Sequence, residues 1–376
     1  MGIYERLGVP TVINADGNMT VLGGSLMPPV ALEAMAEAAR SYVDLREFRA
    51  RVCERIAELT HNEAAFVSTG AAACMLLATA ACVTGEDQAK IGRLPHVEDM
   101  EKNEVVCFRS QRTGFDHAIR TVGVKLVEVG TSQGAGEADL EAALSPRTAC
   151  VFYYGGAWWQ KGAPALERVI AVAHRQGIPV VVDAAAQLPP VENLWRFTQV
   201  GADLAIFSGG KGICGPQPTG LLLGRKDLIR AAELNSSPGY SIGRPLKVGK
   251  EELAGLLAAL EWYLGLDQKA LAERRERQVQ YLVEGLVGLS GVSAVREFPG
   301  EVGVPIPRVL VTLDPDVLGL AKDEVVRRLW QGNPRIAVGG TGEDEISRRS
   351  FYINPQTLEE GEEEIVLARL LDALAR

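Results

Sequence analysis

A lysine between glycines follows an apolar stretch near the middle of the chain. Residues 208–212 read Ser-Gly-Gly-Lys-Gly, directly after a run that is typical of a buried strand. Glycine has no side chain, so another group can approach the backbone closely there. The amine of Lys211 could then form an imine, or Schiff base, with a carbonyl group of a cofactor or substrate. An exposed lysine in a glycine-rich turn is the alternative, and this segment alone does not decide between them.

An aspartate ends a second apolar run, Val180 to Val182. In an open α/β sheet, ligands bind beyond the carboxyl ends of the strands. The carboxylate of Asp183 could pair there with a protonated pyridine nitrogen and keep the ring electron-poor. Ala185, two residues further on, is small enough for a flat ring to lie against the chain. Alternatively, Asp183 caps the start of a helix.

A turn of small residues, Ser68-Thr69-Gly70-Ala71, lies between an expected strand and an apolar helix. Free N–H groups and the dipole at a helix start favour an anion, commonly phosphate, although a plain capped helix is the alternative. An anion-binding turn, a strand-end aspartate and a lysine 28 residues later supply together the three contacts that pyridoxal 5'-phosphate (PLP) needs. We therefore predict PLP as the cofactor, Lys211 and Asp183 as catalytic residues, and no metal site.

Several longer stretches are distinctive: residues 13–17 with 22–25, 68–73, 110–114, 182–187, 243–248 and, most specific, Ser208-Gly209-Gly210-Lys211 with Gly215-Pro216-Gln217. Through them the sequence resembles the fold-type I PLP enzymes over roughly residues 10–360. It is most similar to the branch of selenocysteine synthase (seryl-tRNA selenium transferase) and D-glucosaminate-6-phosphate ammonia-lyase, and closer to the ammonia-lyase-like members. The resemblance implies an aspartate-aminotransferase-like fold with a Schiff base on Lys211.

The resemblance also assigns further roles. Lys211 would act as the general base, and Asp183 would bind the pyridinium nitrogen. Gln111 would lie near the outer face of the ring, where such enzymes often have an aromatic residue or histidine. The other cofactor-binding candidates are Ser68, Thr69, Gly70, Ala71, Ala185 and Ser208, of which Thr69, Gly70, Ala71 and Ser208 would hold the phosphate.

Substrate contacts are expected mainly from arginine, which clamps a carboxylate through two hydrogen bonds. Arg335 lies in the C-terminal part of the chain, where this fold usually provides such a residue, and Arg112 is its rival. Asn14 is the third substrate-binding candidate. For each arginine a surface ion pair is the alternative. Weaker candidates are Gln187 near the cofactor, Arg244 and Lys247 from a neighbouring subunit, His117 as a proton carrier, and Trp158 and Trp159 as pocket walls.

The elements that must position these residues alternate between strand and helix. Apolar strand candidates lie at 105–108, 125–129, 148–153, 178–183, 202–207 and 219–223, with helical patterns between them. Such alternation implies crossover connections and a mostly parallel sheet, here of seven strands. We expect a PLP-binding large domain over 46–245, an α+β small domain over 246–376, and an N-terminal segment, 1–45, that packs with the small domain.

The composition of the chain limits the classes of partner that are expected. The net charge of −9 argues against nucleic acid as the main partner, since phosphate backbones attract basic surfaces. The six cysteines include no CxxC pair, so a reducing cytoplasm is expected, and no signal peptide or membrane span is visible. We predict a homodimer or a larger homo-oligomer that acts on a small molecule and binds neither DNA nor a membrane.

The expected reaction is α-proton abstraction from an amino acid or aminosugar acid, followed by α,β-elimination to a 2-keto acid and ammonia. A racemase or epimerase, and a seryl-tRNA selenium transferase-like enzyme, would use the same carbanion and are the alternatives. A catalytically silent PLP-binding protein is the alternative outside enzymes, against which Lys211 and Asp183 argue.

Overall fold

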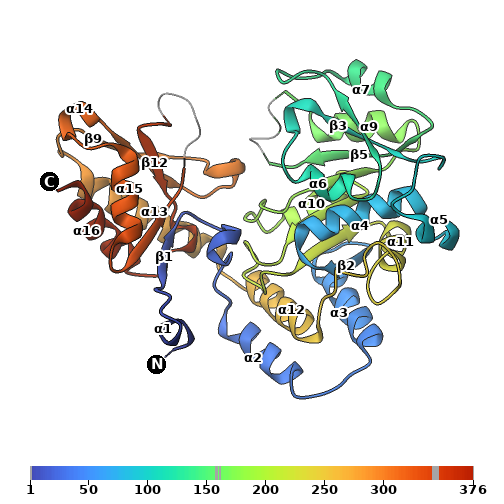
Figure 1. Ribbon diagram of the computed structural model, residues 1–376, viewed down its shortest axis with the longest axis horizontal. Helices are drawn as coiled ribbons and strands as arrows, with labels where there is room; N and C mark the ends of the chain where they lie inside the picture. Colours follow the sequence, from blue (N-terminus) through green and yellow to red (C-terminus); the bar gives the residue numbers. More distant parts are fainter. Residues whose placement is uncertain (1, 157–159, 161, 341–346, 376) are drawn as a thin grey trace. The chain divides into compact units, whose positions relative to one another are not determined.

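The computed structural model describes residues 2–156, 160, 162–340 and 347–375. The chain forms two compact units, each with its own apolar core (Figure 1). The larger unit comprises Met27–Gly265 and Val302–Val304, and the smaller comprises Met1–Leu26, Leu266–Glu301 and Pro305–Arg376. Residues 27–45 and 246–265 therefore lie in the larger unit, on the other side of the expected boundaries. The reason is that α2 (Pro29–Ala38) packs along α12 (Lys250–Leu264), a contact between distant parts of the chain.

The larger unit contains a seven-stranded sheet, which confirms the predicted fold class. Its strand order is β2-β8-β7-β6-β5-β3-β4, and only β8 runs antiparallel to its neighbours. The carboxyl ends of the other six strands therefore share one edge. The strands are β2 (Ala64–Ser68), β3 (Glu104–Phe108), β4 (Lys125–Val129), β5 (Thr148–Tyr154), β6 (Val180–Asp183), β7 (Leu204–Ser208) and β8 (Gly220–Gly224).

Helices cover both faces of this sheet, because its strands are apolar on both sides. One face packs against α4 (Gly70–Thr84) and α11 (Lys226–Leu234), which share a core with Phe152, Ile206 and Leu222 (Figure 1). On the other face, the ring of Phe197 contacts that of Phe207. The remaining helices among the described residues of this unit are α3 (Leu45–Leu59), α5 (Gln88–Arg93), α6 (Asp116–Arg120), α7 (Glu137–Ala143), α9 (Leu166–His174) and α10 (Asn193–Gln199).

The smaller unit is the expected α+β arrangement. Its antiparallel sheet has the order β12-β10-β9, and a separate parallel pair joins β1 to β11. That pair explains why the first residues of the chain belong to this unit. The strands are β1 (Val12–Ala15), β9 (Val292–Glu297), β10 (Arg308–Leu313), β11 (Arg335–Val338) and β12 (Ser350–Ile353), and the helices are α1 (Ile3–Arg6), α13 (Gln268–Leu286), α14 (Pro315–Leu318), α15 (Lys322–Gln331) and α16 (Glu362–Leu374).

Candidate functional site

The loop that carries Lys211 begins at the carboxyl end of β7 and is packed tightly onto the rest of the larger unit. The N–H of Gly209 donates to the carbonyl of Thr219 at 2.8 Å, and the N–H of Cys214 donates to the carbonyl of Lys211 at 2.9 Å. A Cβ atom on Gly210 would lie 2.5 Å from the Cα of Gln217. The close approach that the glycines predicted therefore occurs at Gly210, and the approaching group is the protein's own chain.

Asp183 ends β6 at the same edge, next to the Lys211 loop. Its Oδ1 accepts a hydrogen bond of 2.9 Å from the N–H of Ala185, so it closes a local turn and does not cap a helix. Burial raises the pKa of the Asp183 carboxyl above its ordinary value, while the Ala185 N–H and the charge of Lys211 act in the opposite direction. A partly buried carboxylate with a cation nearby fits a positively charged ring nitrogen.

The start of α4 forms a cradle for an anion together with three strands. Ser68 of β2 and Ser208 of β7 lie in register on either side of Gly220, the first residue of β8. A Cβ atom on Gly220 would lie 2.7 Å from the backbone nitrogen of Ala71, so only glycine lets α4 begin this close to the sheet. Gly220 was not predicted from the sequence, although its position at the start of an apolar strand was an available signal.

The donors of this cradle fit a phosphate. Ser68 is fully buried, and no described residue forms a hydrogen bond with its Oγ or with the Oγ1 of Thr69. The first turn of α4 has no acidic residue and no side-chain cap. Buried hydroxyls at a helix start that lack a protein partner are suited to an anionic ligand. The residues therefore fit the phosphate group of PLP, with Ser208 as a further hydroxyl at the same register.

Gln111 lies at the same edge of the sheet, just beyond β3 (Glu104–Phe108), but its amide is occupied. It is fully buried, and its Oε1 accepts from the N–H of Tyr154 at 3.1 Å while its Nε2 donates to the Tyr154 carbonyl at 3.4 Å. Gln111 therefore continues the hydrogen bonding of β5 with its side chain. Contact between the outer face of a ring and this side chain stays a prediction.

The substrate-binding candidates fall into both units. In the larger unit, Arg112 is ion-paired with Asp116 and Glu128, as in the alternative interpretation. In the smaller unit, the Arg335 guanidinium lies over the ring of Trp330, 5.6 Å from its centroid. Binding of the substrate carboxylate by Arg335 stays a prediction.

Asn14, also in the smaller unit, uses its side chain locally. Its Oδ1 accepts from the N–H groups of Asp16 and Gly17, and its Nδ2 donates to the Gly17 carbonyl at 2.8 Å. These bonds shape the turn after β1, so any substrate contact would be shared with them. The sequence alone could not reveal this use, because asparagine serves turns and ligands equally well.

The weaker candidates have mixed surroundings. Gln187 is buried and its Nε2 donates to the carbonyl of Val302 at 3.4 Å. His117, Arg244 and Lys247 are exposed. Trp158 and Trp159 lie outside the described residues.

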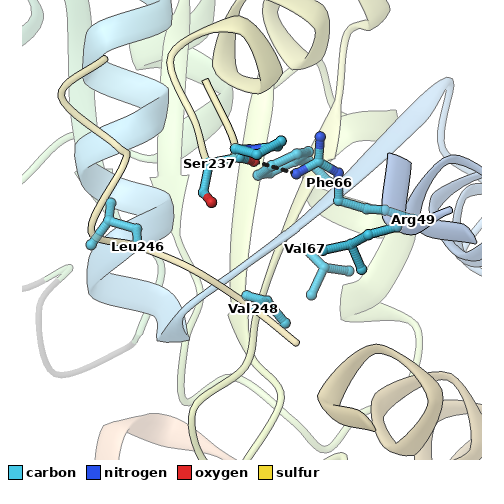
Figure 2. A pocket seen from close by; sticks show the side chains of 8 residues that line it. Arg49, Phe66, Val67, Ser237, Leu246 and Val248 are labelled. Atoms are coloured by element: carbon cyan, nitrogen blue, oxygen red, sulfur yellow. Dashed lines mark hydrogen bonds between the residues drawn. The ribbon is translucent and has the colours of Figure 1, made fainter. Parts of the chain in front are cut away.

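A small cavity behind β2 is not a ligand site (Figure 2). It measures about 10 Å³, roughly enough for one water molecule. Arg49 lies beside it, above the Phe66 ring, and donates to the carbonyl of Ser237 at 2.5 Å. This contact fixes the loop after α11. Among the residues that the structure covers, none gather as a metal-ligand cluster, and no helix is long and apolar enough to cross a membrane.

Comparison with known proteins identifies the family. The model of the L-seryl-tRNA selenium transferase family matches residues 12–275. A 5'-C-glycyluridine monooxygenase-decarboxylase from a Streptomyces species is 34% identical over 99% of this chain and 92% of its own length. The D-glucosaminate-6-phosphate ammonia lyase of Salmonella typhimurium is 32% identical over 98% of this chain and 96% of its own.

Solved structures give the same picture. A structure of D-glucosaminate-6-phosphate ammonia-lyase superimposes with a TM-score of 0.86 at 32% identity, covering 100% of this chain and 98% of the other. The serine palmitoyltransferase of Sphingomonas wittichii has a TM-score of 0.62 at 12% identity, covering 96% and 87%, and supports the fold alone. The predicted resemblance and the fold-type I architecture are both confirmed.

Proposed function

We propose that this chain, which belongs to the L-seryl-tRNA selenium transferase family, is a PLP-dependent lyase. It would remove the α-proton of an amino acid or aminosugar acid and expel a β-substituent, and hydrolysis of the resulting unsaturated amine by water would yield a 2-keto acid and ammonia. One observation carries the proposal: Lys211, Asp183 and a cradle of unsatisfied hydroxyls meet at the same edge of one sheet.

Each of these groups has a defined task. PLP, when bound, supplies an electron sink for the pair left by the departing α-proton. Asp183 would hold the ring nitrogen in its protonated form, because a buried carboxylate strongly favours a cationic partner. Ser68, Thr69, Ser208 and the start of α4 would bind the phosphate. The Lys211 amine would anchor the cofactor covalently and, once displaced by the substrate amine, accept the α-proton.

Arg335 is the better candidate for the substrate carboxylate, because Arg112 would first have to leave two carboxylates. We expect Arg335→Lys to raise KM about tenfold or more with a smaller change in kcat, since lysine cannot reproduce the paired hydrogen bonds. Arg112→Lys should mainly lower thermal stability. Steady-state kinetics and melting curves check both. A larger KM effect at Arg112 would reverse the assignment.

The reaction itself is tested by proton NMR in deuterated water. The reconstituted enzyme is mixed with D- and L-amino acids and aminosugar acids, including 6-phosphorylated D-glucosaminate. We expect a keto product and a matching amount of ammonia with at least one of them. Loss of the α-proton signal without a new product would contradict the lyase and indicate a racemase, or a transferase lacking its second substrate.

A second candidate is oxygen-dependent decarboxylation. The 34% identity with the monooxygenase-decarboxylase favours it as much as the 32% identity favours the lyase. An oxygen electrode separates the two: a lyase leaves dissolved oxygen unchanged, whereas the alternative consumes oxygen and releases carbon dioxide in step with substrate loss.

A homodimer in the cytoplasm completes the proposal. Large apolar side chains stand exposed along the first 43 residues, among them Val21, Leu26 and Tyr42, and burying such side chains would favour association between subunits. All six cysteines are free thiols, which supports a reducing compartment. A monomeric mass by light scattering at micromolar concentration would contradict the dimer.

A further inference from the structure

A buried carboxylate with three hydrogen-bond donors lies just outside the candidate site. Asp116, at the start of α6, is only 1% exposed. Its Oδ1 accepts from the hydroxyl of Tyr154 at 3.0 Å, and its Oδ2 is ion-paired with Arg112 and accepts from the N–H of Thr113 at 3.3 Å. Burying a carboxylate is costly unless every lone pair is used, so this network is tightly specified.

Tyr154 connects this hydrogen-bond network to the neighbourhood of Asp183. The two residues are register partners on the parallel strands β5 and β6, so their side chains share one face of the sheet. The Tyr154 hydroxyl donates to the Asp116 carboxylate. Burial, with the negative charge of Asp183 as a smaller cause, raises the pKa of Tyr154, which keeps the phenol neutral. The ring therefore forms an uncharged wall beside the Asp183 carboxyl.

Gln111 attaches the same segment a second time. Its amide bonds to both main-chain groups of Tyr154 at 3.1 and 3.4 Å. The segment 109–116 is thus joined to the end of β5 once through the tyrosine hydroxyl and once through its backbone. A phenylalanine beside an apolar residue would fill similar space at no cost in charge burial, so packing alone does not account for the pair.

We propose that Tyr154 and Asp116 are positioning residues, which hold the wall beside Asp183 in place and thereby set how tightly the cofactor ring is bound. This inference deepens the proposed function and rests on it. Neither residue takes part in proton transfer. They act through Asp183, because the wall limits both the movement of its carboxyl group and the access of water to it.

The neighbouring tyrosine offers a matched control. Tyr153 is also fully buried and its hydroxyl donates to the carbonyl of Pro164 at 3.1 Å, but its side chain lies on the opposite face of the sheet. Tyr154→Phe and Tyr153→Phe each remove one buried hydroxyl, the first bonded to Asp116 and Thr113 and the second to the Pro164 carbonyl. A purely structural role predicts similar effects on both, whereas a positioning role predicts a difference at the cofactor.

The experiment measures PLP affinity by titration, visible circular dichroism of the reconstituted protein, and thermal melting without PLP. We expect Tyr154→Phe to weaken PLP binding about tenfold and to change the visible dichroism, as loss of a hydrogen bond to a charged group suggests. Asp116→Asn should change the dichroism in the same direction. Tyr153→Phe should leave affinity and dichroism unchanged, even where its melting temperature falls equally.

Equal affinities and spectra for the Tyr154 and Tyr153 variants would overturn the inference while leaving the proposed function intact. Absence of any visible cofactor band in the unaltered protein would instead overturn the proposed function, and the inference with it.

Discussion

Replacing Lys211 with alanine should lower turnover at least about 10⁴-fold, because one side chain serves both as covalent anchor and as general base. The visible absorption of the covalently bound cofactor should disappear. PLP should still bind without a covalent bond, since the cradle around Ser68 and Gly220 does not involve Lys211. Steady-state assays measure turnover, and absorption spectra measure the covalently bound cofactor. Competition between PLP and inorganic phosphate measures the non-covalent binding.

Lys226→Ala is the control, because this lysine is exposed at the start of α11, in the same unit. Its activity should match that of the unaltered protein. Partial recovery of the Lys211→Ala variant by added small amines would support the role in proton transfer. Full activity of that variant without such amines would contradict the mechanism.

Replacing Asp183 with asparagine should have opposite effects on activity and on stability. Turnover should fall about 10³-fold, since the ring nitrogen would lose the carboxylate that keeps it protonated. Without PLP, however, the variant should melt higher at pH 7, by a few degrees, because a carboxylate that is costly to bury has become a neutral amide. Melting curves with and without PLP measure the stability effect.

The direction of this stability change follows from the raised pKa of Asp183. The folded cofactor-free protein binds a proton at this group more tightly than the unfolded chain does. The contribution of Asp183 to the free energy of unfolding therefore falls as pH rises from 3.8 through the raised pKa. Above that pKa the loss is complete. Asp183→Asn should lack this part of the pH dependence. An unchanged pH profile of melting, or a variant less stable than the parent without PLP, would show that Asp183 is not destabilising in the folded protein.

The strands and their mostly parallel arrangement could be predicted from the sequence, because they depend on local patterns. Each apolar run is a few residues long, and alternation with helices implies parallel pairing. The same rule brought Ser68, Asp183 and Ser208 to one edge, since the carboxyl ends of parallel strands meet there. Most residues of the candidate site could therefore be predicted, because each stands in a short motif that is recognisable by itself.

Contacts between distant residues were not accessible in this way. The unit boundary moved because α2 packs on α12, more than 200 residues away. One ion pair of Arg112 requires Glu128 on β4, and the Tyr154–Asp116 bond spans 38 residues. No short motif encodes such pairings. The sequence predicted a close approach to the glycine beside Lys211, but it could not show that the approaching group is the distant Gln217.

The cradle at Gly220 has a consequence for how the protein resists unfolding. It joins the start of α4 to a hairpin, β7–β8, that lies about 140 residues further along the chain. A phosphate bound there would act as a reversible cross-link between those segments. At a free concentration a hundred times Kd, PLP would add about 2.7 kcal/mol to the free energy of unfolding. Digestion by a protease should therefore slow when PLP is added, most strongly at sites that open when α4 separates from the hairpin.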